Sequence, residues 1–127
     1  MVRQYAKYMG IAIVLIGVVG LLLGEQSLLG LLNIDLGEDI VHLATGGLMA
    51  YAGFQMRDSA AVRMVVGGLG VVYLLVVVLG VLSPTLFGLL PSGYSVVDHL
   101  IHAALATAGI AFGWFLKGAA SSDLAAR

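Results

Sequence analysis

The sequence predicts an all-α integral membrane protein, a four-helix bundle built from two tandem helical hairpins. Three observations predict this class. Only 10% of the 127 residues are charged, against about 25% in soluble domains, and 61% are hydrophobic. The few charges separate long uncharged runs, and the second half of the chain repeats the pattern of the first.

The uncharged runs cover residues 8–24, 40–56, 64–97 and 99–116. A membrane-spanning helix needs about 17–25 mostly apolar residues, so the third run is too long for one span. Pro84 and Pro91 divide it, because proline removes a backbone donor and clashes with the preceding helical turn. We therefore expect helices over residues 6–24, 38–56, 62–82 and 95–117, in a single domain of residues 1–127.

Two apolar segments connect these helices on the side opposite the termini. Residues 26–36 and 86–90 are predicted to form short helices lying in or on the membrane rather than solvated loops. Both segments would cover the outer mouth of the bundle. The first span is predicted to be an uncleaved helix, because no small-residue cleavage motif follows it.

The basic residues are sorted to one side of the four predicted spans. They are Arg3, Lys7, Arg57, Arg63, Lys117 and Arg127. Positive charge marks the cytoplasmic side, so we predict a plasma-membrane protein with both termini in the cytoplasm. Five acidic residues fall on the other side: Glu25, Asp35, Glu38, Asp39 and Asp98.

The two halves of the chain, residues 8–56 and 64–117, resemble each other. Residues 27–33 (SLLGLLN) match residues 85–91 (TLFGLLP), and residues 38–42 (EDIVH) match residues 98–102 (DHLIH). Each unit contains two spans, so both units have the same topology and are related by an axis along the membrane normal. His42 and His102 are therefore predicted to lie at the same depth and face a shared centre.

These two acidic–polar–x–x–His motifs resemble those of the domain-of-unknown-function 4383 family, small four-helix bacterial and archaeal membrane proteins with repeated Asp-Asn-x-x-His motifs. Here Glu38-Asp39 and Asp98-His99 stand where Asp-Asn is typical. The resemblance covers nearly the whole chain. It implies the four-helix topology and singles out the histidine pair, but it implies no activity.

Polar residues within membrane spans are functional candidates, because they are costly there. The candidates are Glu38, Asp39, His42, Asp98, His99 and His102. Spacings of three and four residues place each acid on the helix face of its histidine, where a carboxylate can hold one imidazole nitrogen. Small residues continue the same stripes: Gly46 and Gly53 after His42, and Ala106, Gly109 and Gly113 after His102.

The favoured interpretation of this cluster is structural. Small residues let membrane helices approach closely, interhelical histidine contacts contribute about 0.6–2 kcal/mol each, and carboxylates stabilise helix N-termini. The protein would then be non-enzymatic, a structural or accessory membrane protein with no cofactor. It would contact the lipid bilayer, as a homo-oligomer or as a subunit of a larger membrane complex. A net charge of −1 offers no basis for binding nucleic acid.

The alternative interpretation is a cofactor site. His42 and His102 could be axial ligands of a b-type haem, with the glycine stripes leaving room for the macrocycle. A divalent metal held by His42, His99, His102 and a carboxylate is the second candidate, because zinc accepts nitrogen and oxygen ligands. Proton transfer through the Asp–His pairs is the third. A transport path is disfavoured, since the polar groups cluster near the outer face.

Overall fold

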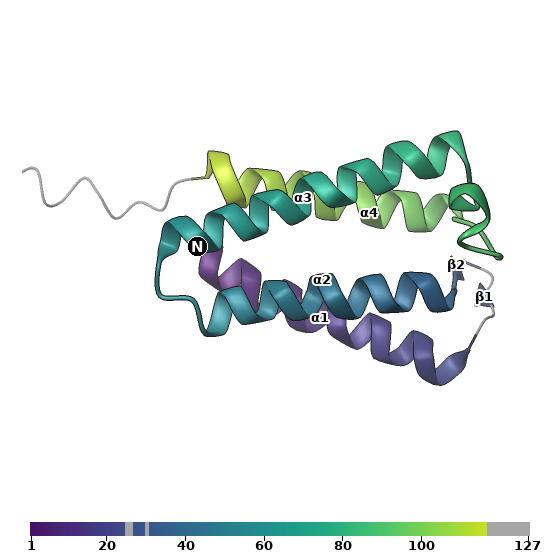
Figure 1. Ribbon diagram of the computed structural model, residues 1–127, viewed down its shortest axis with the longest axis horizontal. Coiled ribbons are helices and arrows are strands. Elements are labelled where there is room, and N and C mark those ends of the chain that lie inside the picture. The colour runs from purple at the N-terminus through teal and green to yellow at the C-terminus, as the bar shows by residue number, and fades with distance from the viewer. Residues whose placement is uncertain (25–26, 30, 117–127) are drawn as a thin grey trace, which may run out of the picture.

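The chain is all-α in its regular structure, apart from one very short hairpin (Figure 1). The computed structural model describes residues 1–24, 27–29 and 31–116. The four helices are α1 (Val2–Leu23), α2 (Leu36–Phe54), α3 (Ser59–Leu82) and α4 (Val96–Ile110), and α4 continues into a π-helical turn, η2 (Ala111–Phe115). Three helical segments are long and apolar enough to cross a membrane: Val2–Leu23, Ser59–Leu82 and Val96–Phe115.

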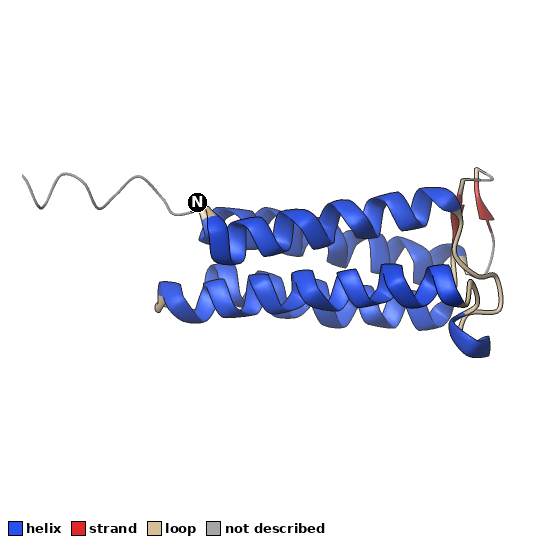
Figure 2. Ribbon diagram, turned by 90° about the horizontal axis from the view of Figure 1, so that it is seen from above, coloured by secondary structure: helices blue, strands red, loops and turns tan. Residues whose placement is uncertain are grey.

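The four helices lie side by side along one long axis (Figure 2). Helix α1 packs along α2, and α3 packs along α4, so each sequence-adjacent pair forms a hairpin. Glycines allow the close approach within each pair. A methyl group on Gly46 of α2 would lie 2.7 Å from the backbone nitrogen of Val14, and one on Gly109 of α4 would lie 2.8 Å from the Cα of Gly70.

The predicted helix positions agree with the structure to within a few residues. Helix α3 begins three residues earlier than predicted, because the Asp58 side chain accepts a hydrogen bond from the Ala60 nitrogen and caps it. Helix α1 begins at Val2 rather than at residue 6. The predicted last residue of the fourth helix, Lys117, lies outside the described residues. Helix α2 is not among the three apolar segments, since its first turn contains Glu38 and Asp39.

The prediction for residues 26–36 was wrong. Strands β1 (Ser27–Leu28) and β2 (Leu32–Asn33) form an antiparallel hairpin there, with Leu28 opposite Leu32. The hairpin satisfies backbone groups across its two strands, and Leu29 at its turn has φ 56°. In the other segment one short turn, η1 (Leu86–Gly88), follows Pro84. Leu86 (φ 44°) and Phe87 (φ 59°) have left-handed backbone angles, so this segment forms a turn rather than the expected short helix.

Hydrogen bonds tie these two connecting segments together. Asn33 Nδ2 donates to the carbonyl oxygens of Ser92 (3.2 Å) and Gly93 (2.8 Å). Ser92 N donates to Asp35 Oδ1, and Ser95 Oγ donates to the Leu31 carbonyl oxygen. Together the two connecting segments cover this end of the bundle. Their hydrogen bonds fix the first turns of α2 and α4 relative to each other.

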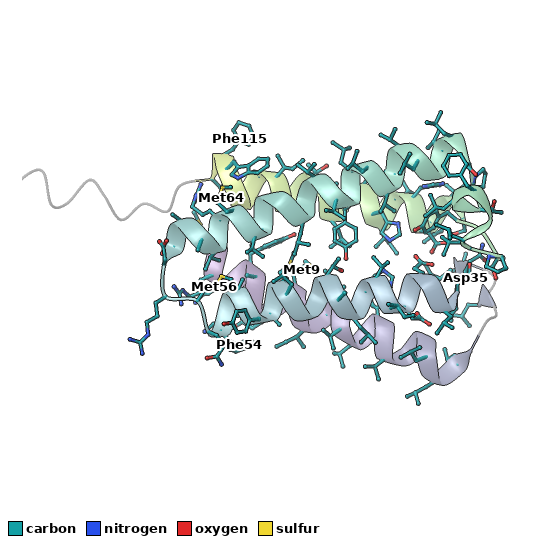
Figure 3. The ribbon with its side chains drawn as sticks, viewed as in Figure 1. Met9, Asp35, Phe54, Met56, Met64 and Phe115 are labelled. Carbon is teal, nitrogen blue, oxygen red and sulfur yellow. The ribbon has the colours of Figure 1, made fainter. Side chains whose placement is uncertain are left out.

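The described basic residues lie at one end of the bundle, and the described acidic residues other than Asp58, the N-cap of α3, lie at the opposite end. Arg3, Lys7, Arg57 and Arg63 lie where α1 and α3 begin, which we call the basic end; Arg3 donates to the Arg57 carbonyl oxygen at 2.8 Å. The opposite or acidic end carries Asp35, Glu38, Asp39 and Asp98. Figure 3 shows Asp35 at this end and Phe54 and Met56 at the other. Glu25, Lys117 and Arg127 lie outside the described residues.

The bundle is apolar outside and rich in small and polar residues inside. Leu22, Leu100 and Val81 are 80%, 65% and 68% exposed, and large aliphatic side chains are exposed along all four helices. The buried positions of α1 include Ala6, Gly10, Gly17 and Gly20. Monomeric water-soluble proteins rarely expose large contiguous apolar surfaces, so this distribution is compatible with a membrane protein.

Candidate metal and ligand site

Six ionisable side chains are buried at the acidic end of the bundle. Their exposed fractions are Asp35 0%, Glu38 7%, Asp39 5%, His42 8%, Asp98 4% and His102 3%. Buried charges are usually paired with charges of opposite sign. The described Lys and Arg residues all lie at the basic end, so this end has an excess of acidic groups.

Glu38, His42 and His102 converge at the centre of this end. His102 Nε2 lies 3.6 Å from Glu38 Oε1, and the rings of the two histidines have centroids 5.9 Å apart. One donor atom from each of the three residues lies within 4.8 Å of the other two. Helix α2 contributes Glu38 and His42 from adjacent turns, and α4 contributes His102 from the other hairpin.

Glu38, His42 and His102, which we call the triad, contain several atoms that lack a hydrogen-bond partner among the described residues. They are Glu38 Oε2, His42 Nδ1 and His102 Nδ1. A buried polar atom without a partner costs about 1–3 kcal/mol, so most native proteins satisfy such atoms with protein, water or an ion. Tyr5 OH, Asp35 Oδ2 and His99 Nδ1 also lack a partner among the described residues, so unpaired atoms alone do not define a site. The feature particular to Glu38, His42 and His102 is that their donor atoms also converge.

The pairing differs from the one predicted by helix spacing. The close carboxylate–imidazole contact joins Glu38 to His102 on the other hairpin, rather than Asp39 to His42 or Asp98 to His102. Asp39 instead lies against Gly20 of α1, where a Cβ would collide with its carboxylate. Spacing along one helix predicts which side chains share a face, but it cannot predict what the facing helix places opposite them.

Asp98 and His99 have structural positions outside the triad. The Asp98 carboxylate accepts from Ser95 N at 2.8 Å, and Ser95 Oγ accepts from Asp98 N, so the two form a capping box at the start of α4. Asp98 therefore stabilises a helix N-terminus, as predicted. The His99 ring lies beside Tyr94, with centroids 5.4 Å apart, and faces Gly80 of α3. His99 therefore lies away from the other predicted metal ligands, His42 and His102.

Two tyrosines lie against His102, and the sequence did not associate either of them with the histidines; Tyr94 was expected in an aromatic belt at the membrane interface. Tyr73 stacks on the His102 ring at 5.7 Å, and Tyr94 meets the same ring edge-on at 5.2 Å. Thr45 Oγ1 donates to the Val41 carbonyl oxygen, so the 2.8 Å contact between Thr45 and Tyr73 is a bond that Tyr73 donates. Burial raises the pKa of the Tyr94 hydroxyl, and the Glu38 and Asp98 carboxyl groups raise it further.

The predicted small-residue stripes pack helices together within each hairpin. Gly53 lies against Lys7 and Ala6 of α1, and Gly113 lies against Gly67 of α3. Gly46 and Gly109 make the equivalent contacts nearer the triad, and Ala106 is buried beside Gly70. Neighbouring backbone therefore fills the space that the haem interpretation required. We conclude that the residues here do not fit a haem macrocycle.

An apolar cavity of about 260 Å³ opens onto the triad. Leu15, Ile16 and Val19 of α1 and Ile101 and Leu105 of α4 line its sides, and Glu38, His42 and His102 form its floor. Helices α1 and α4 belong to different hairpins and make no extensive contact with each other at this end. The cavity occupies the space between them.

No protein-family model, curated protein or solved structure matches this chain. The resemblance to the domain-of-unknown-function 4383 family therefore stays a prediction, and the site must be interpreted from its own chemistry.

Proposed function

We propose that this protein is a small multipass membrane protein that binds one divalent transition-metal ion between Glu38, His42 and His102. The convergence of the three buried side chains, with donor atoms within 4.8 Å of one another, carries the proposal. Two imidazoles and one carboxylate are an established ligand set for zinc and for other first-row divalent metals.

The charge distribution supports a cation at this position. Four carboxyl groups are buried at the acidic end, and the described residues place no Lys or Arg beside them. Asp35 and Asp98 accept hydrogen bonds from the backbone nitrogens of Ser92 and Ser95. Asp39 lies against α1. Glu38 is therefore the carboxyl group of this end that is left to bind an ion beside the two histidines.

The distances also suit a small ion. Donor atoms around a tetrahedral zinc ion lie about 2.0–2.2 Å from the metal, and hence about 3.3 Å from one another. The 3.6 Å between His102 Nε2 and Glu38 Oε1 is close to that value, and His42 must approach by rotation of its side chain. Three protein ligands leave a fourth position, which the cavity can supply with water or another ligand.

Metal titration in mild detergent tests the proposal. Protein freed of metal by chelator should bind one Zn²⁺ or Co²⁺ per chain, and the cobalt form should show the visible absorption of a site with nitrogen ligands. Glu38→Gln and His42→Gln should each weaken binding at least about 100-fold, because they remove a direct ligand rather than an outer-shell partner.

His99→Gln is the matched control for these variants. His99 lies at the same end of the bundle but faces Tyr94 and Gly80, so its loss should leave metal affinity unchanged. The proposal fails if the parent protein binds no metal stoichiometrically. It also fails if His99→Gln weakens binding as much as His42→Gln does.

A membrane location for the bundle is part of the proposal. The exposed aliphatic side chains, the three long apolar segments and the inward-facing polar groups of α2 support four spans. The sorting of Arg3, Lys7, Arg57 and Arg63 to one end supports cytoplasmic termini in the plasma membrane.

Cysteine accessibility tests this topology, since the chain contains no cysteine of its own. Gln55→Cys, in the connection between α2 and α3, should react with a membrane-impermeant maleimide only after the membrane is permeabilised. Leu89→Cys, at a position 76% exposed at the acidic end, should react in intact cells. The opposite pattern would invert the proposed orientation, and equal labelling of both sites in intact cells would contradict a membrane-spanning bundle.

The remaining features of the proposal concern the role of the protein in the membrane. We propose a non-enzymatic accessory protein, built from a tandem repeat of residues 8–56 and 64–117 and related to the family that it resembles. His42 and His102 come from different hairpins and their ring centroids lie 5.9 Å apart, which supports the repeat. A native mass measurement in mild detergent reports subunit number and bound ion together.

A further inference from the structure

We propose that the cavity between α1 and α4 binds a neutral lipid-soluble molecule with a hydroxyl-bearing ring, such as an alkylphenol, entering sideways from the bilayer. This inference rests on the proposed membrane location. Its head group would contact Glu38 and His42, which are also proposed metal ligands, so the inference concerns the metal-free protein and is tested on protein treated with chelator.

The mouth of the cavity faces the outside of the bundle. Ile16 and Val19 of α1 are 48% and 45% exposed, and Ile101 of α4 is 37% exposed. In a bilayer these side chains would contact acyl chains. A ligand that reaches the cavity through them must therefore be soluble in lipid, and its tail can remain between the two helices.

The floor of the cavity determines the chemistry of the head group. Glu38 Oε2 can accept a hydrogen bond, and His42 Nδ1 can donate or accept one, depending on its tautomer. Both residues line the cavity and are more than nine-tenths buried. One hydroxyl group donates and accepts at the same oxygen, so it can satisfy both atoms.

The charged groups that line the cavity and the volume of the cavity further restrict which ligand can bind. An anionic head would be repelled by the buried carboxyl groups of Glu38, Asp39 and Asp98, which line the same cavity. A cationic head on a ligand that enters sideways from the bilayer would have to cross the apolar mouth, where charge costs several kcal/mol. This cost applies to the lateral route and not to a metal ion that reaches the site from the aqueous face. An engineered apolar cavity of about 150 Å³ holds benzene, so 260 Å³ accommodates one substituted six-membered ring.

Binding of para-decylphenol to the metal-free protein in phosphatidylcholine nanodiscs tests this inference. Equilibrium dialysis against empty nanodiscs should show saturable binding of one molecule per chain. Decylbenzene, decanoate and decyltrimethylammonium should each bind at least tenfold more weakly. Equal binding of decylbenzene would show that the polar floor is not used, and equal binding of either charged probe would contradict a neutral head group.

Two tryptophan substitutions on α4 locate the site. Ile101→Trp should fill the mouth and weaken para-decylphenol binding at least tenfold, while zinc affinity stays unchanged. Leu100→Trp is the matched control, since Leu100 is 65% exposed and does not line the cavity, and it should bind like the parent. Unchanged binding in Ile101→Trp would overturn the proposed location.

The same samples separate the two proposals. If the protein binds zinc but its metal-free form shows no saturable para-decylphenol binding, this inference alone is contradicted. A protein that binds para-decylphenol but no zinc contradicts only the metal site.

Discussion

Replacing Gly46 with alanine is expected to lower the free energy of unfolding by about 1–3 kcal/mol, the usual cost of overpacking an interior. The added methyl group would lie 2.7 Å from Val14 N and 3.0 Å from the Gly10 carbonyl oxygen. Both are backbone atoms of α1, so they cannot move aside by side-chain rotation, and the two helices must separate. Thermal unfolding in mild detergent, followed by circular dichroism, measures the loss.

Gly47 is the matched control on the same helix, because nothing lies within 4 Å of a methyl group there. Alanine is the better helix former by about 0.8–1.0 kcal/mol, so Gly47→Ala should leave the free energy of unfolding unchanged or raise it. Gly109→Ala on α4 and Gly68→Ala on α3 repeat the comparison in the second hairpin. Of these two glycines, Gly109 meets the backbone of Gly70, and Gly68 has nothing within 4 Å of an added methyl group. Equal effects within either pair would show that close helix contact is not required.

The double variant Glu38→Met/His102→Leu is expected to lose metal binding while remaining at least as stable as the parent. Replacing a buried polar pair with apolar side chains of similar volume is often neutral or stabilising by about 1–4 kcal/mol. Here the replacement also removes a carboxyl group from among other buried carboxyl groups, together with the unpaired Glu38 Oε2 and His102 Nδ1. Metal titration and thermal unfolding on the same samples measure both effects.

The single variants distinguish two interpretations of the cluster, one in which it binds an ion and one in which it holds the two hairpins together. Glu38→Met or His102→Leu alone leaves the other residue without its partner, at a cost of about 1–3 kcal/mol. If the cluster is kept for binding, the double variant recovers this loss. If the double variant is less stable than either single variant, Glu38 and His102 staple the two hairpins together, and the structural interpretation drawn from the sequence is correct.

The sequence was sufficient to predict the helices because their signals are local. Runs of apolar residues bounded by charges placed four helices to within a few residues, and Pro84 marked the end of the third. The connecting segment at residues 26–36 could not be predicted in the same way. Its hairpin depends on pairing across the turn and on Asn33 reaching Ser92 and Gly93, which are distant in sequence.

The candidate site was predicted only in part, for the same reason. Helix spacing selected His42, His102 and their neighbouring acids, and the structure brings both histidines together with Glu38. Spacing could not indicate that His99 faces Tyr94 instead. Tyr73 also escaped notice, since one tyrosine in a long apolar run carries no signal until its hydroxyl is seen bonded to Thr45.

The sequence by itself predicted a helical chain with four helices, with its basic residues on one side and five of its seven acidic residues on the other. Those properties follow from composition and from the order of residues along each helix. Only the tertiary structure showed that Glu38 contacts His102, and that a cavity opens beside these residues. Both depend on how the two hairpins pack, and no periodicity within a single helix encodes the contacts between residues on different hairpins.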